Sequence, residues 1–100
     1  MDWASAPRWR LLTASSLKFH AWPGEEFVLV FHSASGDTHL VDALSAEVLR
    51  RLQDGPLTEE TLWRRLLEQT GFSAEEFPLD RLQPILTQLE QLSLVERATA

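Results

Sequence analysis

Histidines are the side chains of this sequence that could most readily gather a metal ion. His20, His32 and His39 all fall on segments with strand patterns, so a sheet could bring them together. Their spacing follows no known ligand pattern, however, and we interpret them as ordinary strand residues. No metal and no other cofactor is therefore expected.

Serines and paired acids are the remaining candidates for catalysis. Ser15 and Ser16 lie in no Gly-x-Ser-x-Gly elbow, and the chain has no glycine-rich phosphate loop. Acids occur as adjacent pairs such as Glu59-Glu60, but neighbours on a helix diverge by about 100° and do not face each other. A chain of 100 residues also has little volume for a deep active site. We therefore predict that the protein is not an enzyme.

Composition narrows the possible partners and the compartment. The net charge of −6 opposes binding to nucleic acid and to anionic lipid. The absence of cysteine excludes disulfides and makes a reducing cytoplasm the expected location. No apolar run approaches the roughly 20 residues of a membrane span. We expect one domain, residues 8–97, after a flexible N-terminus at residues 1–7.

The first half of the chain has the pattern of an antiparallel meander. Strands are predicted at Leu17–Trp22, Phe27–His32 and Thr38–Val41, with short turns between them. Aromatic and β-branched side chains fill FVLVFH, so this strand is expected at the centre. Arg8–Leu12 is a further short candidate strand.

The second half of the chain has helical periodicity. A first helix follows the third strand, with Asp42 or Ser45 as its N-cap and Gly55 as its stop. A second helix is predicted at residues 59–70, with Thr58 as its N-cap.

A third helix is indicated by an apolar stripe from Leu79 to Leu92. Pro84 lies inside this stripe, which predicts either a start near Asp80 or a kink. Leu94–Glu96 could add an extended piece. The expected fold is α+β: a three-stranded antiparallel sheet followed by three helices, similar to a winged helix-turn-helix.

One flank of the third helix is a candidate binding surface. Arg81, Ile85, Gln88 and Leu92 follow one another at i, i+4, i+7 and i+11, beside the predicted core line. The flank is either the partly exposed edge of the core or one wall of a groove.

The third strand is the candidate for the other wall. It is an edge strand unless the first segment of the chain pairs with it, and Thr38–Val41 contains no lysine or proline that would block an edge. An open edge beside a groove suits strand addition by an extended peptide.

The chain resembles the PqqD family of peptide chaperones, also called the peptide recognition element of ribosomally made, modified peptides, over roughly residues 27–94. The family pattern is a short strand ending in Leu and Asn, a small residue, a helix ending in Asp-Gly, and a next helix that opens on Thr or Ser. Asp42 stands at the Asn position and can still act as a cap. SASGDTHLVD and FVLVFH are most similar to the subgroup of the HPr-rel-A system, which is encoded beside an HPr-kinase-like protein. The matching positions are Leu40, Ala46, Asp54, Gly55 and Thr58.

The resemblance implies a three-stranded sheet followed by three helices of winged-helix type. It also implies that the leader of a precursor peptide binds as an added strand and is presented to a separate modifying enzyme. The similarity to the subgroup further implies an HPr-kinase-like protein as a possible partner of this chain. The peptide would lie along Asp37, Thr38, His39, Leu40 and Val41, and would touch Arg81, Ile85, Gln88 and Leu92.

Two alternatives stay open at the level of sequence. A winged-helix fold could bind DNA or take part in transcription, although the third helix carries one arginine and two acids. Two copies of the chain could also pair through their edge strands, so the protein is either a monomer or a homodimer of this kind.

Overall fold

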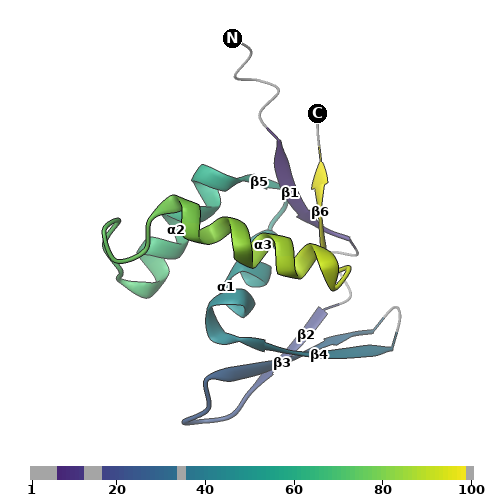
Figure 1. The fold of residues 1–100 in the computed structure, drawn as a ribbon. Helices are drawn as coiled ribbons and strands as arrows, with labels where there is room; N and C mark the ends of the chain where they lie inside the picture. Colours follow the sequence, from purple (N-terminus) through teal and green to yellow (C-terminus); the bar gives the residue numbers. More distant parts are fainter. Residues whose placement is uncertain (1–6, 13–16, 34–35, 99–100) are drawn as a thin grey trace.

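The fold is α+β, with three helices and two small antiparallel sheets of three strands each (Figure 1). The computed structural model describes residues 7–12, 17–33 and 36–98. The strands are β1 Arg8–Leu11, β2 Leu17–Ala21, β3 Phe27–His32, β4 Asp37–Asp42, β5 Leu57–Thr58 and β6 Val95–Ala98. The helices are α1 Ala43–Leu52, α2 Glu59–Thr70 and α3 Leu82–Gln91, the last preceded by a 3-10 turn, η2 Leu79–Arg81.

The first sheet is the predicted meander, in the order β2-β3-β4. FVLVFH forms β3 and lies at its centre, as the sequence indicated. Val28, Val30 and Val41 are buried on one face, and Val28 pairs with Val41 in the β3–β4 register. Successive side chains of a strand point to opposite faces, so this inner face packs on the core and the other, outer face lies away from it.

The second sheet corrects the prediction of a single sheet. β1 forms its centre and pairs antiparallel with both β5 and β6. Trp9 and Leu11 are buried, so β1 alternates between core and solvent. The pairing was not foreseen because β5 has only the two residues of Leu57–Thr58 and lies far from β1 in the sequence.

Helices α1 and α2 begin at predicted capping residues and α2 ends at the predicted Gly71, whereas α1 ends at Leu52, before the predicted stop at Gly55. Asp42, rather than Ser45, caps α1, because its Oδ1 accepts the N–H of Ser45 at 2.7 Å. Thr58 caps α2 by accepting the N–H of Thr61 at 3.3 Å. Gly71 ends α2 with φ 78°, a left-handed conformation that glycine adopts at low cost.

The third helix starts close to the predicted position. η2 begins at Leu79, and Pro84 is the third residue of α3. The N–H groups of a first helical turn have no intrahelical acceptor, so a proline there removes no helical bond. The start near Asp80 is therefore confirmed.

Helix α1 connects the two sheets to the helical layer. It contacts β1, β3 and β4 as well as α2 and α3, and Figure 1 shows it between the lower sheet and the other helices. Val48 and Leu49 on α1 are fully buried. The core continues through further buried leucines of the other helices, Leu62, Leu66, Leu82, Leu86 and Leu89.

Some sequence predictions concern residues outside the described ranges. These are most of the predicted flexible N-terminus, Ser15 and Ser16, and the middle of the turn before β4. Among the described residues, none of the helices has the length and apolar character that crossing a membrane requires.

Candidate functional site

β4 is an edge strand in the folded chain. Its sheet has the order β2-β3-β4, and β1 pairs with β5 and β6 instead of with β4. Within residues 7–12, 17–33 and 36–98, no strand lies along its far side. The condition that the sequence left open, pairing by the first segment of the chain, is therefore not met within these residues.

One hydrogen bond fixes which main-chain groups of β4 face β3. The N–H of Ala43 donates to the carbonyl oxygen of Glu26 at 3.0 Å, just beyond the ends of the two strands. Antiparallel ladders alternate between residue pairs that exchange hydrogen bonds and pairs that do not. Glu26 and Ala43 are therefore a bonded pair, and every second pair of the β3–β4 register is bonded as well. One of these bonded pairs is Val30 and His39.

The residues between these bonded pairs direct their main chain outward. Thr38 and Leu40 occupy these positions, so their N–H and C=O groups point away from β3, toward the open edge. The register runs without a bulge from Asp37 to Asp42. The open edge thus presents donors and acceptors at the spacing of a strand, ready for a further strand.

The side chains of β4 divide between the two faces of the sheet. Leu40 is 61% exposed, which is high for a leucine, and Thr38 and Asp37 are also exposed. Val41 is buried in the core, and His39 is half-buried. Of the residues predicted on this strand, Thr38 and Leu40 therefore offer both side chain and main chain at the edge.

The predicted flank of the third helix combines exposed polar side chains with half-buried apolar ones. Arg81 and Gln88 are exposed, whereas Ile85 and Leu92 are half-buried and pack against the core. Gln88 lines a hollow of about 670 Å³ on α3 together with Asp80, Gln83, Pro84, Thr87 and Gln91.

The two predicted walls contribute to different hollows. Gln88 lines the hollow on α3, whereas Leu40 lines a separate one on the sheet. Helix α1 contacts both β4 and α3 and so fixes their relative position.

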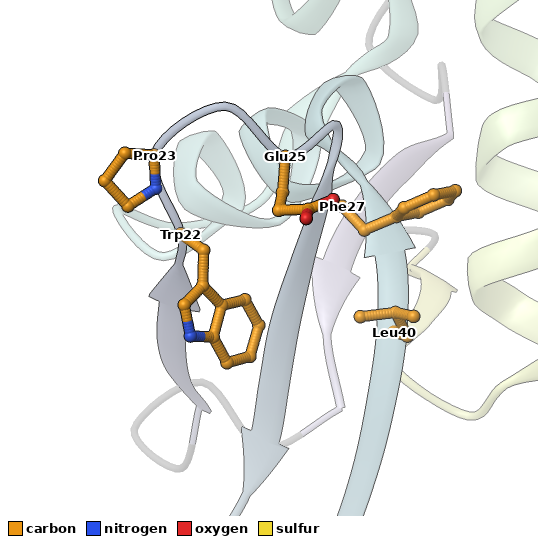
Figure 2. A pocket seen from close by; sticks show the side chains of 5 residues that line it. All are labelled: Trp22, Pro23, Glu25, Phe27 and Leu40. Carbon is orange, nitrogen blue, oxygen red and sulfur yellow. The ribbon is translucent and has the colours of Figure 1, made fainter.

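The hollow beside β4 was not anticipated from the sequence. It has a volume of about 720 Å³ and lies over the outer face of the sheet (Figure 2). The apolar run of β3 could have suggested it, because alternate positions of FVLVFH place large side chains on both faces. Its lining residues are Trp22, Pro23, Glu25, Phe27 and Leu40.

The histidines are dispersed rather than clustered. His20 is exposed beside Trp22, with ring centroids 4.4 Å apart in an edge-to-face arrangement, while His32 and His39 are half-buried. Within the part of the chain that the structure describes, no three His, Asp or Glu side chains are grouped as metal ligands would be.

Most arginines that form ion pairs do so away from β4. Arg10 pairs with Glu96 between β1 and β6, and Arg50 and Arg51 both pair with Glu47 on α1. Near the hollow, by contrast, the described residues provide no ion pair to Glu25. Glu25 is therefore the one charged side chain in the otherwise apolar lining that the described residues give the hollow.

These observations describe an edge strand with outward main-chain groups and an adjoining apolar hollow. Comparisons of the chain with protein-family models, with curated proteins and with solved structures found no match.

Proposed function

We propose that the protein is a non-catalytic peptide-binding module that takes up an extended peptide as an additional strand along β4. The observation that carries the proposal is the open β4 edge, where Thr38 and Leu40 direct their N–H and C=O groups away from the sheet. Proteins usually block such an edge with lysine, proline or a bulge, and β4 has none of these.

Main-chain pairing would provide affinity that depends little on the peptide sequence. Thr38 and Leu40 can each donate and accept one hydrogen bond to the added strand. The peptide must lose its flexibility on binding, which offsets part of the contact energy. We expect a dissociation constant on the order of 1 μM, about −8 kcal/mol, for the isolated domain.

The resemblance to PqqD proteins suggests what the peptide is. It would be the leader of a precursor peptide, presented to a modifying enzyme, with an HPr-kinase-like protein in the same system. The joint from β4 to α1 supports this comparison, because Asp42 caps α1 as the family's asparagine could. The proposal also assigns contacts with the leader to Arg81 and Gln88 on the helix-three flank, whose side chains are exposed.

A DNA-binding role is the second interpretation, and the arrangement of the helices is what suggests it. The exposed side of α3 offers amide side chains such as Gln83 and Gln88, which could in principle contact bases. Phosphate contacts require a basic surface, however, and the chain has a net charge of −6. We therefore favour the peptide.

The test uses a displayed library of random 12-residue peptides selected on the wild-type protein. Thr38→Pro and Leu40→Pro each remove one outward N–H and should weaken the selected peptides by about tenfold or more, because a peptide carbonyl loses its donor. Ala21→Pro is the matched control on the opposite edge strand β2, where the same alternation directs the N–H of Ala21 away from β3.

Circular dichroism and thermal melting establish that each variant is folded before binding is measured. Equal affinity of wild type, Thr38→Pro and Leu40→Pro, with all three folded, would refute strand addition at β4. A mobility-shift assay with duplex DNA at low salt tests the second interpretation, and a salt-sensitive shift would favour it.

A further inference from the structure

The outer face of the β2-β3-β4 sheet exposes an unusual set of large apolar side chains. Trp22, Phe27 and Phe31 are 45%, 47% and 37% exposed, and Leu40 is 61% exposed. Phe27, Phe31 and Leu40 alternate with buried residues of β3 and β4, so they share the face that is turned away from the core. A grouped apolar surface of this kind is typical of an interaction site.

The hollow on this face has fixed walls. Figure 2 shows the Trp22 indole on one side, Phe27 and Leu40 on the other, and Pro23 and Glu25 on the turn between β2 and β3. The turn is closed by the N–H of Glu25, which donates to the carbonyl oxygen of Trp22 at 3.1 Å. Residues on a closed turn are ordered before a ligand arrives, which lowers the cost of binding.

The side chains that line the hollow favour a ligand with both a cation and an apolar group. Trp22 supplies an aromatic face and Glu25 a carboxylate that has no ion pair among the described residues. A cation is attracted by both groups, and it gains more from tryptophan than from other aromatic rings. Phe27 and Leu40 instead offer contacts only to an apolar group.

We propose that this hollow binds a segment of a partner protein in which an arginine or lysine stands next to a large apolar residue. The cation lies between Trp22 and Glu25, and the apolar side chain lies on Phe27 and Leu40. The site goes beyond the proposed function, because it binds side chains on the sheet face while the β4 edge binds a peptide main chain. Leu40 belongs to both surfaces, so the two ligands would be neighbours.

The net negative charge of the chain disfavours a second copy of the chain, anionic lipid and nucleic acid as occupants of the hollow. A second copy of this chain would bring the same Glu25 and Glu26 and the same net charge of −6 to the interface. Like charges brought together at an interface oppose association. Anionic lipid and nucleic acid meet the same repulsion.

The experiment selects random displayed 12-residue peptides on the Thr38→Pro variant, so that β4 pairing is already weakened. Enriched peptides should carry Arg or Lys beside Leu, Phe or Trp. Their binding should shift the indole N–H signal of Trp22 in nuclear magnetic resonance spectra, which is identified by its loss in Trp22→Phe. Trp22→Ala should weaken binding by at least about tenfold, as expected for a tryptophan at the centre of an interface.

Reversal of charge gives the sharper readout. Selection on Thr38→Pro combined with Glu25→Lys should enrich Asp or Glu beside the apolar residue in place of Arg or Lys. Glu90→Lys on α3 makes the same charge change at another exposed site and should leave the preference for cations unchanged.

Several outcomes would overturn the site. These are an absence of enriched peptides, binding that ignores both Trp22→Ala and Glu25→Lys, and a dimer in sedimentation that Trp22→Ala dissociates. The two proposals fail independently. Wild-type binders that are unaffected by Thr38→Pro refute strand addition alone, whereas insensitivity to Trp22→Ala and Glu25→Lys refutes the hollow alone. Leu40→Pro does not separate the two, because Leu40 belongs to both surfaces.

Discussion

The two sheets of this protein have the same number of strands and the same antiparallel pattern, but they place their tryptophans differently. Trp9 on β1 is 2% exposed, its Nε1 donates to Glu59 Oε1 at 3.2 Å, and Arg97 stacks on its ring. Trp22, which follows β2, is 45% exposed and lines an open hollow. The comparison shows that β5-β1-β6 buries its tryptophan in the core, whereas β2-β3-β4 leaves one face and the β4 edge exposed.

The largest expected difference is between the two tryptophans. Trp9→Ala should lower the free energy of unfolding by about 3–5 kcal/mol, because it leaves a cavity in the core. Trp22→Ala should lower it by about 1 kcal/mol or less, since it removes mainly exposed surface and the contact with His20. Urea denaturation of both variants measures the difference, and equal losses would contradict the division of roles.

The next comparison lies within β4 itself. His39→Pro removes an N–H that faces β3 and should cost about 1–3 kcal/mol of stability, because the carbonyl oxygen of Val30 loses its donor. Thr38→Pro removes an outward N–H and should cost about 0.5 kcal/mol or less, as edge strands tolerate proline. Thermal melting of the two variants tests the assignment, and the reverse order would show that the main chain of β4 faces the other way.

A smaller effect is expected where β4 meets α1. Asp42→Ala removes the acceptor of the Ser45 N–H and should cost about 1 kcal/mol. Asp42→Asn introduces the other common capping residue and should change stability by only a few tenths of a kcal/mol, because Asn and Asp cap about equally well. A loss in Asp42→Asn as large as in Asp42→Ala would show that the charge, rather than the cap, matters here.

The smallest effect concerns the surface of the β5-β1-β6 sheet. Arg10 and Glu96 form an ion pair between β1 and β6, with side chains 53% and 33% exposed. Arg10→Gln should therefore cost at most about 0.5 kcal/mol, and the difference should decrease in high salt. A cost that is larger and independent of salt would mean that this pair is part of what holds the second sheet together.

Local signals predicted most of the fold. The strands of the meander and the two capped helices follow from periodicity, from Thr58 and from Gly71, all of which act within a few residues. The second sheet was missed because Arg8 pairs with Thr58 and Ala98, at distances along the chain where no local pattern operates.

The candidate site was predictable to a similar extent. That Thr38–Val41 has no lysine or proline is visible in the sequence, and the strand order then leaves β4 at the edge. Which residues of β4 point outward depends on the register with β3, and that register joins residues on two separate strands. The apolar run FVLVFH indicates large side chains on both faces of β3, but it does not reveal which face the helices cover and which one carries the hollow.

Strand β4 enters α1 without a loop, and Asp42 is both the last residue of the strand and the cap of the helix. A ligand that pulls on β4 therefore transmits force directly to α1, and through α1 to β1, α2 and α3. Val48 and Leu49 on α1 are fully buried, so a shift of α1 would disturb the core. If a segment pairs with β4, we therefore expect it to detach under load before β4 separates from the rest of the protein.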